Sequence, residues 1–194
     1  MGLVFKAADE ENHEVALKVM EESPVSDAES LERFRREAEA TQKLSSHPSI
    51  LSVYETGCVG TTHYIAMELV PEACTLDDLF RQGPLPEKRA LDISIKIADA
   101  LSFAHRCGVV HRDIKPTNVL IDDSGSPLLA DFGIARLQTA QTLTMSNASL
   151  GTPEYMAPEQ TLSAKVDARA DIYSFGVIFY EPYKKSAYIY FIPQ

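Results

Sequence analysis

The sequence has few cysteines, no excess of basic residues and no long apolar segment. Its three cysteines, Cys58, Cys74 and Cys107, are widely spaced and form no Cys-x-x-Cys pair, so neither a disulfide framework nor a zinc site is predicted. The 18 basic residues against 28 acidic ones give a formal net charge of −10, which argues against nucleic acid as a partner. A reducing cytoplasm is the simplest setting for such a chain.

Targeting and membrane signals are also missing from the sequence. The N-terminus has no signal-peptide pattern, and no apolar run approaches the roughly 20 residues that cross a bilayer. The chain has 194 residues, of which 45% are hydrophobic and 24% charged, and this suits one domain or two small lobes with a real core. We therefore expect a folded cytoplasmic protein with no membrane segment in this chain.

The first third of the chain predicts a small antiparallel sheet with one helix. Residues 1–7 and 14–20 are typical of paired strands, and Lys18 is the only charge in the apolar part of the second. Such a lysine usually reaches water at a sheet edge; if it points inward it needs a partner, because an unpaired buried charge costs several kcal/mol. The helix predicted from about residue 26 to Thr41 offers Glu37, although Glu37 could equally be a solvated surface charge.

The rest of the chain changes character after a linker at residues 71–74. Further strands are predicted at residues 50–55 and 63–68 before it, and helices at 75–81 and 86–106 after it. Sheet first and helices second predict an α+β fold with two lobes. The expected boundaries are 1–70 for the first lobe, 71–181 for the second and 182–194 for a divergent tail.

Residues 109–122 carry the densest chemistry in the chain. Short apolar runs flank a polar loop, which predicts strand, tight loop, strand. On the loop, Asp113 could accept a proton, Lys115 could neutralise negative charge and Asn118 could ligate a hard cation. These are the needs of phosphoryl transfer, but an Asp-x-Lys pair alone is more often a solvated surface pair.

Four further motifs occur around this loop. In chain order the set reads Val-Ala-x-Lys at 15–18, Glu37 on the predicted helix, His-Arg-Asp-x-Lys-Pro-x-Asn at 111–118, Asp-Phe-Gly at 131–133 and Ala-Pro-Glu at 157–159. In this order the motifs resemble those of the eukaryotic-like, or Hanks-type, protein kinases. Residues 34–38 and 131–136 make the bacterial serine/threonine kinases the most similar group.

The resemblance implies a role for each matching residue. Lys18 would hold nucleotide phosphates and pair with Glu37, while Asp113 would act as the base and Lys115 would meet the γ-phosphate. Asn118 and Asp131 would bind Mg²⁺. Val4, Ala16 and Leu120 would enclose the adenine of ATP, Met67 would be the gatekeeper, and Glu68 to Val70 would be the hinge that bonds the adenine edge. Gly2 would belong to the glycine-rich loop of the same nucleotide site.

The resemblance also implies the acceptor and a mode of regulation. Lys115-Pro116 and the loop at Gly151–Tyr155 match kinases that phosphorylate serine or threonine of proteins, with Thr152 bridging Asp113 and Lys115. Arg112 implies control by phosphorylation of the loop between Asp-Phe-Gly and Gly151, where self-phosphorylation would fall on Thr142, Thr144 or Ser146.

The match is incomplete at both ends of the chain. Of the glycine-rich loop only Gly2 and Val4 occur, and the family pattern stops after Glu181, so we interpret the sequence as a truncated kinase domain. Helical residues that later helices would normally cover are then expected to form an exposed apolar patch: Ile172, Phe175, Ile178 and Phe179. A catalytically inactive kinase-like binding module, or a non-functional fragment, is the alternative; a small-molecule phosphotransferase would leave Ala-Pro-Glu unexplained.

Overall fold

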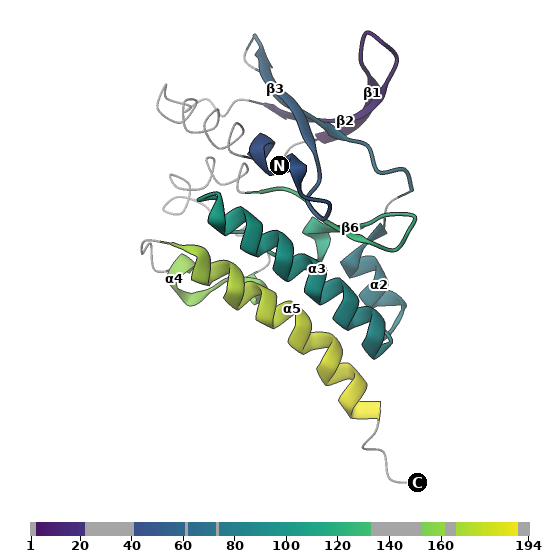
Figure 1. The fold of residues 1–194 in the computed structure, drawn as a ribbon, viewed down its shortest axis with the longest axis vertical. Helices are drawn as coiled ribbons and strands as arrows, with labels where there is room; N and C mark the ends of the chain where they lie inside the picture. Colours follow the sequence, from purple (N-terminus) through teal and green to yellow (C-terminus); the bar gives the residue numbers. More distant parts are fainter. Residues whose placement is uncertain are drawn as a thin grey trace.

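The computed structural model describes residues 3–21, 41–60, 62–72, 74–132, 153–161 and 166–189. Within them lie a four-stranded antiparallel sheet, a small three-stranded sheet and a group of helices (Figure 1). The strands are β1 (Leu3–Ala8), β2 (Glu14–Glu21), β3 (Val53–Val59), β4 (Thr62–Glu68), β5 (Cys74–Thr75), β6 (Val119–Ile121) and β7 (Pro127–Leu129). The α-helices are α2 (Leu76–Gln82), α3 (Glu87–Arg106), α4 (Pro158–Thr161) and α5 (Ala168–Ile189), and the short 3₁₀ helices are η1 (Lys43–Ser46), η2 (Pro116–Asn118) and η5 (Pro153–Tyr155).

This architecture confirms the predicted α+β fold. The first sheet, in the order β1-β2-β4-β3, is built from residues before the linker, and the order β5-β6-β7 makes the second sheet. Helices α3 and α5 run side by side below the sheets (Figure 1). The helix α5 crosses the expected boundary at 181 and continues to Ile189.

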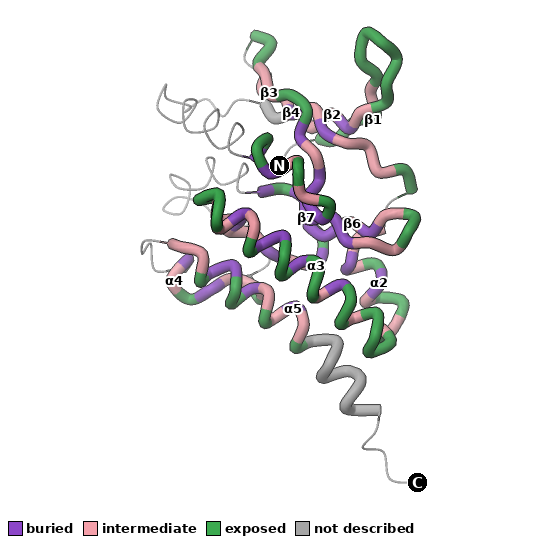
Figure 2. Tube along the Cα trace, in the orientation of Figure 1, coloured by how far each residue is buried: buried purple, intermediate pink, exposed green. Residues whose placement is uncertain are grey.

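Helix α3 explains how the larger core forms. Its buried residues recur at helical spacing: Ile93, Ile97, Ala100, Leu101 and Ala104. These residues form a stripe that faces the core, and the opposite face of the helix is largely exposed (Figure 2). Pro86 precedes the helix and Gly108 follows it with φ of +77°, so the predicted limits of 86–106 are right to within one residue.

A smaller core joins the two sheets. Ala16 of β2 and Met67 of β4 lie opposite each other and pack in one cluster with Leu128 and Ala130. Backbone bonds reinforce this junction, because Leu51 donates to the Leu129 carbonyl at 3.0 Å and Leu129 donates to the Ser49 carbonyl at 2.9 Å. The junction fixes where the first sheet stands relative to the loop that carries the motif at residues 111–118, the predicted catalytic loop.

Two sequence predictions are corrected here. Residues 109–110 form no strand; instead the Val109 N–H bonds to the Ala104 carbonyl at 2.9 Å and closes the end of α3. Ile178 is buried in the main core rather than exposed, and Phe175 and Phe179 are partly buried against that core. Ile172, which is 56% exposed, is the one member of the expected patch that lies in solvent.

Candidate functional site

The catalytic-loop residues predicted from the sequence form one hydrogen-bonded group. Lys115 Nζ lies 2.8 Å from Asp113 Oδ2, and the Asn118 side-chain amide donates to the Asp113 carbonyl at 2.8 Å and to Asp113 Oδ2 at 2.9 Å. Asn118 is buried at the end of η2, whereas the Asp113 side chain keeps 42% of its surface exposed. The Asp113 carboxylate is therefore held by Lys115 and Asn118 and is still partly open to solvent.

A buried carboxylate holds the backbone of this loop. Asp171, which is 1% exposed, accepts hydrogen bonds from the His111 N–H at 2.8 Å and from the Arg112 N–H at 2.7 Å. The His105 Nε2 atom lies 2.8 Å from the same carboxylate and donates to it, because a carboxylate only accepts. Arg112 has φ of +66°, an uncommon value for a residue other than glycine, and its bond to Asp171 helps to fix this conformation.

His111 supports the loop as a neutral imidazole. Its Nδ1 accepts from the Asp113 N–H at 3.3 Å, so Nε2 carries the proton and donates to the Ala130 carbonyl at 2.9 Å. The Phe132 ring stacks against it with centroids 4.6 Å apart. Complete burial lowers the pKa of His111, and the charge of Asp171 opposes that change.

The lowered pKa of His111 makes stability depend on pH. A histidine whose pKa is lowered by folding stabilises the folded state above its unfolded value of about 6.5, and this stability is lost as the pH falls from there toward the lowered pKa. We expect the free energy of unfolding to fall between about pH 7 and 5 more steeply in the wild type than in His111→Gln, by up to about 1.4 kcal/mol per pH unit. Urea unfolding at several pH values measures this slope. The exposed His13→Gln variant is the control and should keep the wild-type slope; a His111→Gln slope equal to the wild type would contradict the role given to His111.

Lys18 also points inward, toward the other end of the site. Its Nζ lies 2.5 Å from Asp131 Oδ1, with the lysine side chain 12% and the aspartate side chain 40% exposed. The pairing joins β2 of the first sheet to the second residue after β7. The partner suggested from sequence, Glu37, lies outside the described residues.

Asn118 and Asp131 fit a divalent cation by chemistry and by position. The Ala130 N–H donates to the Asn118 carbonyl at 2.9 Å, which places Asp131 beside Asn118. The side-chain nitrogen of Asn118 donates to Asp113, so the side-chain oxygen of Asn118 is the atom that could ligate a cation. A carboxylate and an amide oxygen are the hard donors that Mg²⁺ prefers.

Residues expected around an adenine ring meet beside this group. Ala16 and Met67 belong to the smaller core, and Val70 and Leu120 pack partly buried against it. Val4 lies across from Lys18 in the β1–β2 register but is 58% exposed. These positions come from both lobes, as a nucleotide held between them would need.

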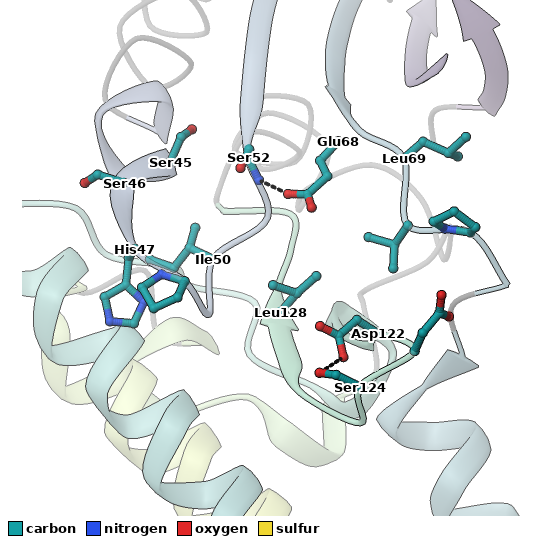
Figure 3. A pocket seen from close by; sticks show the side chains of 14 residues that line it. Ser45, Ser46, His47, Ile50, Ser52, Glu68, Leu69, Asp122, Ser124 and Leu128 are labelled. Carbon is teal, nitrogen blue, oxygen red and sulfur yellow. Dashed lines mark hydrogen bonds between the residues drawn. The ribbon is translucent and has the colours of Figure 1, made fainter. Parts of the chain in front are cut away.

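A cavity of about 570 Å³ opens next to Glu68 and Val70 (Figure 3). Glu68 Oε2 accepts from the Ser52 N–H at 3.3 Å on its upper side, and Ser124 donates to Asp122 at 2.6 Å on its lower side. None of the catalytic-loop residues lines it. The cavity therefore lies beside the predicted hinge, and Asp113, Lys115 and Asn118 are not among its lining residues.

Several predicted site residues lie outside the part of the chain that the structure describes: Gly2, Glu37, Thr142, Thr144, Ser146 and Thr152. Gln160, in contrast, contacts the catalytic loop but was not predicted as a site residue. It follows the Ala-Pro-Glu motif and has no charge or reactive atom that would mark it. Among the described residues, no helix is long and apolar enough to cross a membrane.

Comparison with known proteins agrees with this geometry. Residues 1–190 match the family model described as protein kinase domain. The serine/threonine-protein kinase PknB of Mycobacterium leprae is 40% identical over 187 residues, covering 93% of this chain and 30% of that protein. PrkC of Bacillus subtilis is 39% identical over 170 residues, covering 88% of this chain and 26% of that protein.

In a third relative, the matched region makes up more of the protein's length than in the first two. PknL of Mycobacterium tuberculosis strain H37Rv is 40% identical over 167 residues, covering 86% of this chain and 42% of that protein. The chain thus spans less than half the length of these curated relatives. The family model and the relatives place it in one family and one group: the chain belongs to the protein kinases, among the Hanks-type serine/threonine kinases of bacteria.

Proposed function

We propose that this chain transfers the γ-phosphoryl group of ATP to serine or threonine hydroxyls of protein substrates. The observation that carries the proposal is the group formed by Asp113, Lys115 and Asn118, with contacts of 2.8–2.9 Å. It joins a proton acceptor, a cation and a metal ligand on one loop. A loose phosphoryl-transfer transition state needs such positioning and charge more than covalent chemistry.

Each residue of the group then has one task. The substrate hydroxyl oxygen attacks the γ-phosphorus, the bond from that phosphorus to the bridging oxygen of ADP breaks, and Asp113 takes the hydroxyl proton. Lys115 offsets negative charge on the transferred group. Bound Mg²⁺ would neutralise the phosphate oxygens, and Asn118 and Asp131 are the residues that would hold it.

Lys18 would exchange partners when the nucleotide enters. In the structure its ammonium pairs with Asp131. Phosphate oxygens would compete for the same ammonium, while Asp131 keeps a free oxygen for the cation. Glu37 would orient Lys18 as the resemblance implies, and Thr152 would brace Asp113 and Lys115.

The nucleotide base would lie between the lobes. Ala16, Met67, Val70 and Leu120 supply apolar surface from both sides, and residues 68–70 are the hinge whose backbone would bond the adenine edge. Val4 of β1 would cover the adenine, and Gly2 would belong to the glycine-rich loop of the nucleotide site. Thr142, Thr144 and Ser146 are the proposed self-phosphorylation sites, whose phosphate would pair with Arg112.

The test of this proposal is the loss of phosphate transfer in Asp113→Ala. We expect transfer of radiolabelled phosphate from ATP to a generic protein substrate by the wild-type chain, and a fall of about 10²–10⁴-fold in the variant, the usual contribution of a catalytic base. Glu72→Ala, which changes an exposed acidic residue near the linker, is the control and should keep wild-type turnover. A wild-type chain that transfers no more phosphate than Asp113→Ala would favour the inactive binding module instead.

A further inference from the structure

Gln160 joins the segment after Ala-Pro-Glu to the catalytic loop. It belongs to α4, is 6% exposed, and both polar atoms of its amide are bonded. Its Oε1 accepts from the Ala157 N–H at 3.0 Å, and its Nε2 donates to the Arg112 carbonyl at 2.8 Å. A buried amide with both ends engaged is costly to replace, because each broken bond leaves a buried group unsatisfied.

The carbonyl that Gln160 contacts belongs to the peptide plane just before Asp113. The other polar group of that plane is the Asp113 N–H, which donates to His111 Nδ1 at 3.3 Å. Gln160 and His111 therefore hold opposite edges of one rigid plane. Because Arg112 adopts φ of +66°, this plane is in a conformation that a free chain would leave readily.

We propose that Gln160 is a positioning residue for phosphoryl transfer: it fixes the peptide plane that sets the direction of the Asp113 side chain. The inference rests on the proposed function of Asp113 as proton acceptor. The task requires a donor for the Arg112 carbonyl and an acceptor for the Ala157 N–H in one uncharged side chain. An amide supplies the two from separate atoms and does not ionise near neutral pH.

Gln160→Glu tests the donor without changing the shape of the side chain. An ionised carboxylate cannot donate to the Arg112 carbonyl and repels it, whereas a protonated one can donate, and burial favours the protonated form. At about pH 8 we expect kcat to fall about 10- to 100-fold, as loss of a buried bond allows, with the KM for ATP changed less than about twofold. At about pH 6 the carboxyl group should be protonated more often, so kcat of Gln160→Glu relative to kcat of the wild type should recover much of its loss. A residue that only stabilised the fold would give no such recovery.

Gln82→Glu is the matched control, because Gln82 is exposed at the end of α2. It should keep the kcat of the wild type at both pH values. Equal kcat for Gln160→Glu and wild type at pH 8 would overturn the proposal, and so would a loss of kcat that is the same at both pH values.

A second measurement does not depend on activity. Amide hydrogen exchange, compared at one pH of about 8, should be about tenfold faster or more at Arg112 and Asp113 in Gln160→Glu than in wild type. The amides of α3 should keep their protection, which shows that the fold persists. Unchanged exchange at Arg112 and Asp113 would overturn the role of Gln160. A wild-type chain as slow as Asp113→Ala would instead refute the proposed function, while the exchange result would still decide whether Gln160 fixes the plane.

Discussion

Replacing Asp171 with alanine is expected to lower the free energy of unfolding by about 3–5 kcal/mol, the size seen when one partner of a buried charged network is removed. The carboxylate accepts three hydrogen bonds at 2.7–2.8 Å, from His105 and from the His111 and Arg112 N–H groups. Alanine would leave both N–H groups buried without acceptors, at about 1–3 kcal/mol for each. Urea unfolding followed by circular dichroism measures the change.

The same variant should lose phosphoryl transfer before it loses its fold. Arg112 would no longer be held at φ of +66°, so Asp113 would sample directions that do not face a substrate. Under conditions where the variant is still folded, turnover is expected to fall at least about 10²-fold, as misplacement of catalytic groups by about 1 Å can cause. Asp92→Ala, which changes an exposed aspartate of α3, is the control and should stay within about 0.5 kcal/mol of wild type. An Asp171→Ala chain as stable and as active as this control would show that the loop does not depend on Asp171.

The catalytic loop can be held in a strained shape because its support is buried on several sides. His111 bonds to Ala130, Asp171 bonds to two N–H groups, and Gln160 bonds to the Arg112 carbonyl. These supports come from the end of β7, from α5 and from α4, which are far apart in sequence. The conformation of the loop therefore depends on how the surrounding helices pack. A substitution in α5 that displaces Asp171 should change the orientation of Asp113 even though the substituted residue does not contact Asp113.

The sequence was sufficient for elements with a strong period or clear end signals. Helix α3 has buried residues at helical spacing, with Pro86 before it and Gly108 after it, and its limits were predicted to within one residue. Residues 109–110 are predicted to form a strand because they are a short apolar run beside a polar loop. The Val109 N–H instead bonds to Ala104, five residues earlier, and closes the end of α3; the apolar run alone does not distinguish these two outcomes.

The candidate site was predicted in its residues and only partly in its contacts. Chemistry-bearing side chains at Asp113, Lys115 and Asn118 were visible as a cluster, and the structure brings them within hydrogen-bond distance. For Lys18 the sequence required some partner, but the contact with Asp131 depends on how β2 stands relative to β7. That relation is set by the smaller core, which no local pattern encodes.

Gln160 and Ile178 show what a single sequence conceals. An uncharged amide after Ala-Pro-Glu carries no signal of its own, and only its bond to the Arg112 carbonyl reveals a task. Ile178 is expected from the sequence to lie in an exposed apolar patch with Ile172, Phe175 and Phe179. It is buried because its side of α5 packs against α3 in the main core, while Ile172 lies in solvent on α5.

Asp131→Asn should weaken Mg²⁺ binding and lower kcat, because it removes the charge of a residue that pairs with Lys18 and is proposed to bind the cation. The asparagine keeps the shape of the side chain but leaves the Lys18 ammonium without its carboxylate and offers the cation a weaker ligand. We expect kcat to fall about 10²–10³-fold, the usual result of removing one preorganised electrostatic group. The Mg²⁺ concentration for half-maximal activity should rise about 10- to 100-fold. Phosphate transfer measured across a magnesium titration gives both numbers.

A binding measurement separates the metal from the chemistry. Calorimetric titration of Mg²⁺ into the chain saturated with a non-hydrolysable ATP analogue should show the same weakening in Asp131→Asn as the activity titration. Asp123→Asn removes an equal charge from the exposed turn between β6 and β7, so it controls for the general loss of negative charge in a chain of net charge −10. Because that turn lies outside the group of Asp113, Lys115 and Asn118, the calorimetric Kd for Mg²⁺ and the Mg²⁺ concentration for half-maximal activity should both stay at wild-type values. If Asp131→Asn bound Mg²⁺ as tightly as Asp123→Asn, the cation would be held by other residues, and Asp131 would serve only as the resting partner of Lys18.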